Sequence, residues 1–323
     1  MAHAIRIQSH GGPDVMKYEE VQVPAPGAGQ VKLKQHAIGV NYIDTYHRSG
    51  LYPQTLPFTP GSEGAGEVTE LGAGVTDLKV GDRVAYAGAG GGYATERLHP
   101  AERLVKIPDG IDYKTAAAMM LQGMTVRYLI KKTYKVGPGT TLLWHAAAGG
   151  VGLIASQWVK ALGGTMIGTA GGPDKVKLAL ANGAAHCIDY TKDDFAAKVK
   201  EITGGKMCDV VYDSIGKDTF PKSLDCLKPL GLFVSFGNAS GAIEAMNPGI
   251  LAAKGSLYMT RPTLFTYTTT RAELLETAND LFDVVKSGKV KIAVNHTYPL
   301  KDAVQCHRDL EGRKTTGSIV LTA

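Results

Sequence analysis

The chain has 323 residues, enough for two domains, and with 44% hydrophobic and 20% charged residues it has the balance of a globular protein with a sizeable core. The formal net charge is a mild +5 without any block of lysine and arginine, so we expect no dedicated nucleic-acid surface. No run approaches the roughly 18 apolar residues of a membrane span. The four cysteines are far apart and the first residues lack a signal-peptide pattern, which argues against a disulfide framework or a four-cysteine zinc lobe and predicts a cytoplasmic protein.

The first part of the chain contains short apolar runs that are separated by glycine and proline. Runs at 31–38, 66–72 and 82–86 have the length and turn flanks of β-strands. We therefore expect residues 1–123 to form a compact, mostly β domain.

From residue 124 onward, the pattern changes to strands that alternate with helices. We expect strands at 141–145, 165–169, 186–189, 209–212 and 232–236, and helices at 150–162, 175–182, 193–202 and 219–227. This alternation predicts an α/β domain over 124–260, with a doubly wound parallel sheet covered by helices on both faces.

The tail carries an expected helix at 271–287 and a final expected strand at 318–321. Because the α/β block lies in the middle of the chain, we expect residues 261–323 to return to the first domain.

The turn after the first strand of the α/β block reads Ala-Ala-Ala-Gly-Gly-Val-Gly over 146–152. A pyrophosphate needs backbone N–H donors, a helix N-terminus and no side chains in the way. We expect Gly149 to let the backbone approach the phosphates and Gly152 to let the helix pack close to the strand, with Gly150 and Val151 between them. A purely structural turn is the alternative, and the strand–turn–helix context favours the cofactor site.

The second strand of the block runs into Ala-Gly-Gly at 170–172, with no carboxylate at its tip. An NAD site carries an acidic residue there for the ribose, and that charge would repel a 2′-phosphate. Lys175 can place a positive charge against the 2′-phosphate beside Gly171, and Tyr190 can add a hydroxyl or stack on adenine. A solvated lysine in the first helical turn is the alternative reading of Lys175. The pattern favours NADPH over NADH.

Five segments, at 39–46, 61–66, 145–152, 213–216 and 235–238, carry a wider resemblance. With them the chain resembles the medium-chain dehydrogenase/reductase superfamily, and within it the zeta-crystallin-like NADPH:quinone oxidoreductases that lack zinc. The resemblance implies a Rossmann domain inserted in a GroES-like catalytic domain. It also implies a homodimer, with an edge strand near 255–259 as the candidate contact.

The resemblance implies further cofactor contacts, position by position. Asn41 and Thr125 match residues at the nicotinamide ribose and amide. Ser214, Phe236 and Gly237 follow strands whose ends face the cofactor. Each also has a plain structural reading, for example as a cap of a turn or helix.

Two arginines complete the implied cofactor set. Arg313 resembles a tail residue that returns to the cleft, and Arg261 is a candidate for the cofactor or the cleft mouth. A surface position is the alternative for Arg313.

Zinc-dependent relatives carry a cysteine and a histidine where this chain has Asn41 and Ser62. Asparagine and serine are poor zinc ligands, so the resemblance implies no metal. We expect the neighbouring Glu63 to be a buried hydrogen-bonding acid.

A ketone needs a Lewis acid or a proton donor before it accepts hydride, whereas a quinone gains aromaticity on reduction. The expected acceptor is therefore a quinone, with a conjugated enal or enone as the alternative. Tyr46, Tyr52 and Asn41 are the candidate catalytic side chains, although the tyrosines could simply line the cleft. We expect structural roles for His47 and His145. An RNA-binding or crystallin-like structural role is the alternative from another class.

Overall fold

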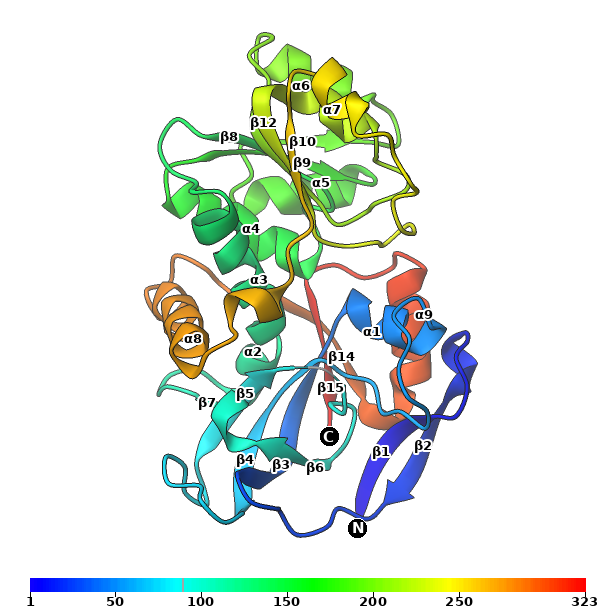
Figure 1. Ribbon diagram of the computed structural model, residues 1–323, viewed down its shortest axis with the longest axis vertical. Helices are drawn as coiled ribbons and strands as arrows, with labels where there is room; N and C mark the ends of the chain where they lie inside the picture. The colour runs from blue at the N-terminus through cyan, green and yellow to red at the C-terminus, as the bar shows by residue number, and fades with distance from the viewer. Residues whose placement is uncertain (89) are drawn as a thin grey trace. The chain divides into compact units, whose positions relative to one another are not determined.

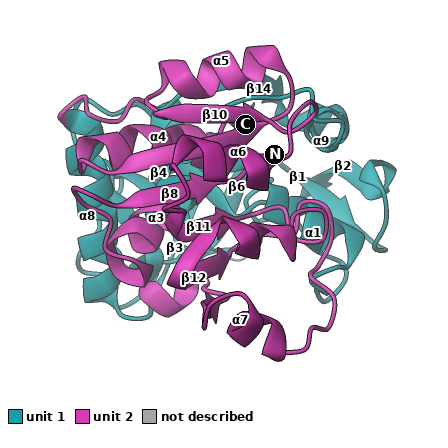
Figure 2. Ribbon diagram, turned by 90° about the horizontal axis from the view of Figure 1, so that it is seen from above, with its two compact units in different colours: residues 1–124, 268–286, 292–323 teal, residues 125–267, 287–291 magenta. Residues whose placement is uncertain are grey.

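The computed structural model describes residues 1–88 and 90–323. The chain folds into two compact units, shown in different colours in Figure 2. The first unit comprises residues 1–124, 268–286 and 292–323, and the second comprises residues 125–267 and 287–291. Most of the tail therefore belongs to the same unit as the N-terminal part.

The second unit is built on a six-stranded parallel sheet with the order β10-β9-β8-β11-β12-β13 (Figure 1). Its strands are β8 (Thr141–Trp144), β9 (Thr165–Ala170), β10 (His186–Asp189), β11 (Cys208–Asp213), β12 (Leu227–Ser235) and β13 (Tyr258–Thr260). The strand order reverses between β8 and β11, which lie side by side. In open α/β sheets, ligands bind at the carboxyl ends of strands at such a switch point. The predicted doubly wound Rossmann sheet is confirmed.

Helices α4 (Gly150–Ala161), α5 (Pro173–Ala181) and α6 (Phe195–Ile202) connect these strands. Aliphatic and aromatic side chains from neighbouring strands form one core with the helices, including Leu143, Ile167, Val211 and Phe233. Burial of this apolar surface is the main stabilising contribution to the unit. The core holds the strand ends, and the turns that follow them, in fixed positions.

The helix that we expected over 219–227 is wrong. The segment forms only a short 3-10 helix, η4 (Lys222–Cys226), and β12 begins at once afterwards. Pro221 disfavours the helical conformation for the residue before it. Thr219 and Ser223 also donate their hydroxyl groups to Asp213 Oδ2, over 2.7 and 3.1 Å, which fixes the segment in an irregular path.

The first unit contains a seven-stranded sheet and a separate two-stranded sheet. Its strands are β1 (Ala2–Ile7), β2 (Met16–Val21), β3 (Gln30–Val40), β4 (Glu63–Leu71), β5 (Arg83–Ala87), β6 (Glu96–Pro100), β7 (Val105–Lys106), β14 (Val294–Pro299) and β15 (Ser318–Thr322). The C-terminal strand β15 pairs with β3, so the end of the chain completes the larger sheet that the N-terminal part begins. The predicted mostly β, GroES-like unit is confirmed.

Five helices belong wholly or partly to this unit: α1 (Tyr42–Ser49), α2 (Tyr113–Ala117), α3 (Met120–Tyr128), α8 (Arg271–Lys286) and α9 (Ala303–Glu311). Helix α1 follows β3, and Asn41 caps its N-terminus. Of the two candidate tyrosines, Tyr46 lies in the helix and Tyr52 follows its C-terminus.

Candidate cofactor and active site

The glycine turn connects β8 to α4 in the second unit. Gly149 caps the helix in an extended conformation, and Gly150, Val151 and Gly152 form its first turn. The N–H groups of a first helical turn have no acceptor within the helix and lie at its positive end. A Cβ atom at Gly152 would lie 2.5 Å from the carbonyl oxygen of Ala146, so only glycine allows this close approach. The turn thus has the open backbone donors that a pyrophosphate requires.

Strand β11 lies next to β8 in the sheet, and β12 lies next to β11. The ends of β11 and β12 are joined by a hydrogen bond and a close backbone contact. Phe236 N donates to Asp213 O over 2.8 Å. A Cβ atom at Gly237 would lie 2.6 Å from the carbonyl oxygen of Ser214. The Asp213 carboxylate accepts from the backbone N of Ile215 and Gly216 over 2.8 and 3.0 Å. Asp213 therefore fixes the loop that carries Ser214, a role that the sequence motif alone did not reveal.

A buried polar chain continues from Asp213 to His145. The Oγ of Ser223 donates to Asp213 Oδ2 over 3.1 Å and lies 2.9 Å from His145 Nε2. The other ring nitrogen of His145 lies 2.9 Å from Thr169 Oγ1. Burial lowers the pKa of His145, so the ring is neutral at neutral pH. The structure thus gives His145 a structural role that joins β8, β9 and β11.

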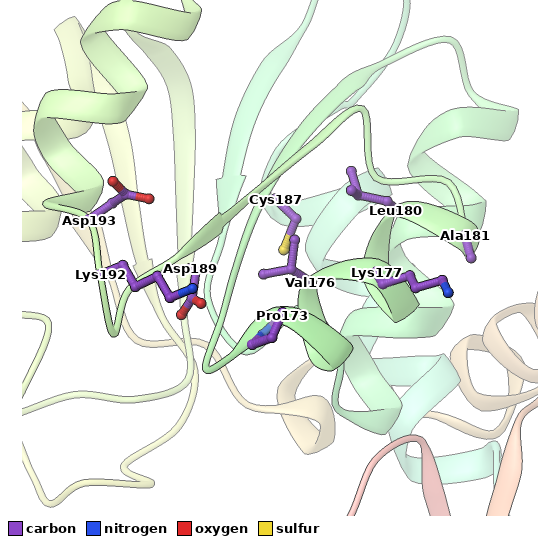
Figure 3. Close-up of a pocket in the computed structure, with 9 residues that line it drawn as sticks. All are labelled: Pro173, Val176, Lys177, Leu180, Ala181, Cys187, Asp189, Lys192 and Asp193. Atoms are coloured by element: carbon purple, nitrogen blue, oxygen red, sulfur yellow. The ribbon is translucent and has the colours of Figure 1, made fainter.

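The turn between β9 and α5 contains the expected 2′-phosphate residues. Tyr190 stands over Gly171: a Cβ atom on this glycine would lie 2.7 Å from the tyrosine hydroxyl. Lys175 lies in the first turn of α5. A surface pocket opens beside the turn, between α5 and β10, and Pro173 and Asp189 line the part nearest to it (Figure 3).

Asn41 caps α1 in the first unit and is 7% exposed. Its Nδ2 donates to Glu63 Oε1 over 2.7 Å, and its Oδ1 accepts from Gln122 Nε2 over 3.2 Å. Its backbone N donates to Asp44 Oδ2 over 2.9 Å. Both the backbone and the amide of Asn41 are therefore held in one orientation.

Glu63 is the first residue of β4. Its side chain is completely buried beside the N-terminus of α3. Its second oxygen accepts from Leu121 N over 2.7 Å. Glycine at position 39 on the neighbouring strand leaves room for it, because a Cβ atom there would lie 2.3 Å from Glu63 Oε1. Burial raises the pKa of Glu63 to about 8. Glu63 is thus a buried hydrogen-bonding acid that links Asn41 to α3.

A second buried acid, Asp44, lies on the other side of Asn41. It accepts from Ser62 Oγ over 2.7 Å and from the Tyr93 hydroxyl over 3.1 Å. The same hydroxyl lies 2.9 Å from His307 Nε2. Burial raises the pKa of Asp44 to about 6. The hydroxyl of Ser62 is therefore already used as a donor to this buried acid.

The candidate tyrosines lie together at the end of α1. The rings of Tyr46 and Tyr52 are 5.2 Å apart in an edge-to-face arrangement, and Tyr52 N donates to Tyr46 O over 3.1 Å. His47 packs between Tyr52 and Phe58, at ring distances of 6.3 and 5.9 Å. Burial lowers the pKa of His47, which makes it a poor proton donor at neutral pH.

The remaining expected residues lie in both units. Thr125 is half-buried in α3, and Arg261 is exposed just after β13. Arg313 is exposed after α9 in a left-handed conformation with a φ of 57°. Thr125 and Arg261 belong to the second unit, with the glycine turn, and Arg313 belongs to the first unit, with Asn41 and the tyrosines.

Two features are absent from the part of the chain that the structure describes, residues 1–88 and 90–323. No set of three or more histidine, cysteine, aspartate or glutamate side chains there is arranged to hold a metal ion. No helix there combines the length and the apolar character needed to cross a membrane.

Comparison with known proteins gives two family matches. Residues 27–109 match the alcohol dehydrogenase GroES-like domain, and residues 182–321 match a family described as zinc-binding dehydrogenase. The chain is 51% identical to a quinone oxidoreductase of Pseudomonas aeruginosa over 99% of both chains, and 47% identical to a 2-haloacrylate reductase of a Burkholderia species over 99% of both. The crystal structure of Escherichia coli quinone oxidoreductase complexed with NADPH matches with a TM-score of 0.98 and 49% identity, covering 99% of this chain and 100% of that one.

Proposed function

The chain belongs to the quinone oxidoreductase family, and on that premise we propose that it is an NADPH-dependent quinone reductase. The glycine turn at the start of α4 carries the proposal, since its form fits a pyrophosphate and a relative of known structure with 49% identity binds NADPH. Bound NADPH supplies the hydride. The residues of the chain bind the cofactor, orient the acceptor and exclude water.

The dinucleotide is held, in this proposal, by residues of the glycine turn and of the strand ends beside it. Gly150, Val151 and Gly152 offer backbone N–H groups to the pyrophosphate, and Gly149, which has no side chain, leaves room for the phosphates to approach. Ser214, Phe236 and Gly237 line the next strand ends, where the Asp213 carboxylate fixes the loop. Residues 146–152 are all alanine or glycine except Val151. The small side chains leave the backbone accessible, which supports this assignment.

The 2′-phosphate binds, in this proposal, at the turn between β9 and α5. Lys175 provides the positive charge, and Gly171 and Tyr190 form the adjoining surface. Phosphate groups are bound by lysine as a point charge and by the first turn of a helix. Thr125, Arg261 and Arg313 remain proposed cofactor contacts.

Asn41 is the proposed contact for the nicotinamide portion of the cofactor. Its amide is oriented by Glu63 and Gln122, and a side chain that is fixed before binding costs less entropy to order. Tyr46 and Tyr52 orient the acceptor or donate a proton to its oxygen.

The reaction requires no zinc in this proposal. Two side chains support a metal-free reaction: Asn41 and Ser62 are poor zinc ligands, and both are hydrogen-bonded to buried carboxyl groups. A quinone needs little polarisation, because its reduction produces an aromatic ring. Hydride transfer then depends chiefly on proximity and orientation.

Conjugated acids, enals and enones are the second candidate class of acceptor, favoured by the 47% identity to a 2-haloacrylate reductase. The test compares NADPH oxidation, followed at 340 nm, with 1,4-benzoquinone, a conjugated enone and 2-chloroacrylate as acceptors. We expect the quinone to give the highest kcat/KM. A protein inactive with quinones and fast with an enone or 2-chloroacrylate contradicts quinone reduction. Stoichiometric zinc in active protein contradicts the metal-free site.

A homodimer in the cytoplasm is also proposed. The edge strand β13 carries Tyr258 with 62% of its surface exposed, and an unpaired edge can add a strand from a second copy. Light scattering on the purified protein tests the dimer, and cell fractionation tests the location.

A further inference from the structure

The last residue of β10, Asp189, is bonded to the turn that leads into α5. Its Oδ1 accepts from Gly172 N over 2.9 Å. The same oxygen accepts from the backbone N and the Oγ1 of Thr191, over 3.1 and 2.7 Å. Hydrogen bonds to an ionised oxygen favour the charged form, and those from Thr191 and Gly172 hold the pKa of Asp189 below its usual range. The carboxylate is therefore charged and bonded within the protein.

Gly172 needs such an anchor because its conformation is unusual. It caps α5 with a φ of 89° and a ψ of 159°, a region that is nearly confined to glycine. Glycine is also the residue with the most freedom to leave such a conformation. The carbonyl oxygen of Gly172 accepts the first helical bond, from Val176 N over 3.2 Å. The bond from Gly172 N to Asp189 therefore fixes the direction in which α5 begins.

The residue that follows Asp189 contacts the same turn. Tyr190 N donates to Ala170 O over 3.1 Å, and the Tyr190 hydroxyl stands over Gly171. The end of β10 thus contacts both glycines of the turn: the Asp189 carboxylate binds Gly172, and the Tyr190 ring packs over Gly171. Figure 3 shows Asp189 beside Pro173, the first residue of α5.

We propose that Asp189 is a positioning residue for NADPH preference: it holds the Gly171–Gly172 turn so that Lys175 and the first turn of α5 face the 2′-phosphate. In sites for NAD, a carboxylate near this end of the sheet binds the ribose hydroxyl itself. Here Asp189, at the end of β10, instead binds the backbone of the turn. Its three hydrogen-bond donors, from Gly172 and Thr191, offset the charge of the carboxylate. The inference rests on the proposed function, because it assumes that NADPH binds at this turn.

The test measures the dissociation constants of NADPH and NADH by calorimetry on the full-length protein. Asp189→Ala removes the acceptor, and Asp189→Asn keeps one acceptor oxygen for Gly172 N. We expect the alanine variant to bind NADPH about tenfold more weakly with less than about a twofold change for NADH, and the asparagine variant to recover most of the loss. Asp193→Ala is the matched control, since it removes a nearby exposed acid that also lines the pocket in Figure 3.

Three results overturn the inference: unchanged NADPH binding in Asp189→Ala, an equal loss for both cofactors, or an equal effect of Asp193→Ala. If Asp189→Ala does not fold, Thr191→Val decides, because it removes one donor from Asp189. It is then expected to weaken NADPH binding about two- to threefold and to leave NADH binding unchanged, and no change would overturn the inference. A wild-type protein that binds NADPH and NADH equally would instead refute the proposed cofactor and, with it, the premise of this test.

Discussion

Asn41 and Glu63 form a buried hydrogen bond of 2.7 Å that joins the start of α1 to β4. Glu63 uses its other oxygen for Leu121 N at the start of α3. Two donors from different elements thus approach one carboxyl group. Both oxygens of a carboxyl group can accept a hydrogen bond, whether it is ionised or protonated, whereas the NH2 group of an amide can only donate, which explains an acid rather than an amide at this position.

Glu63→Gln therefore loses one of the two hydrogen bonds, because its NH2 group must face either Asn41 Nδ2 or Leu121 N. An unsatisfied buried donor costs about 1–3 kcal/mol. We expect the free energy of unfolding at pH 4.5, where the contribution of Glu63 has not yet been lost to titration, to fall by about that amount in urea denaturation. We also expect kcat/KM for the quinone to fall as Asn41 loses its orientation. Glu67→Gln on the same strand is the control and should change the stability by less than about 0.5 kcal/mol. Equal effects of the two substitutions would contradict this account of Glu63.

The pH dependence of stability should also depend on Glu63. Burial raises its pKa from the ordinary value of 4.5 to about 8. A raised pKa in the folded state means that the contribution to stability is complete below pH 4.5 and is lost as the pH rises through 8. We expect the free energy of unfolding of the wild type to decline between pH 5 and pH 8, by at most about 1.4 kcal/mol per pH unit from this group. The slope should be smaller in Glu63→Gln, and parallel curves for the two proteins would refute the assignment.

Part of this site was readable from the sequence and part was not. The need for glycine at 152 could be predicted because it is local: a Cβ atom there would lie 2.5 Å from the carbonyl oxygen of Ala146 in the same turn. The doubly wound order followed from alternating strands and helices. The chain of bonds through Tyr93 could not be predicted, because its partners Asp44 and His307 lie 49 and 214 positions away in the sequence. The irregular segment around η4 was missed because hydrogen bonds to Asp213, rather than periodicity, determine it. Helix α1 was missed although its capping box, formed by Asn41 and Asp44, is local.

Gly149 and Gly152 should respond differently to alanine. A Cβ atom at Gly149 would have only a contact of 3.4 Å with Ala146 O, whereas at Gly152 it would lie 2.5 Å from the same oxygen. Gly149→Ala should fold normally and bind NADPH about tenfold more weakly, because the methyl group occupies the approach to the phosphates. Gly152→Ala should lose about 1–3 kcal/mol of stability through overpacking. Thermal melts and cofactor titrations distinguish the two, and a destabilised Gly149→Ala with intact NADPH binding would reverse the assignment.

Lys175→Gln should weaken NADPH binding and spare NADH. A lysine that faces a phosphate contributes a charge-assisted bond, worth about 1.5–3 kcal/mol, or roughly ten- to a hundredfold in the dissociation constant. NADH has no 2′-phosphate, so its dissociation constant should change by less than about twofold. Lys177→Gln is the matched control: it removes the same charge two residues along α5, from a side chain that lines the surface pocket. Raising the salt concentration should reduce the NADPH preference of the wild type and of Lys177→Gln but have little effect on Lys175→Gln, because screening acts on the charge pair that the substitution has already removed. An identical salt response in all three proteins would show that another cation binds the 2′-phosphate.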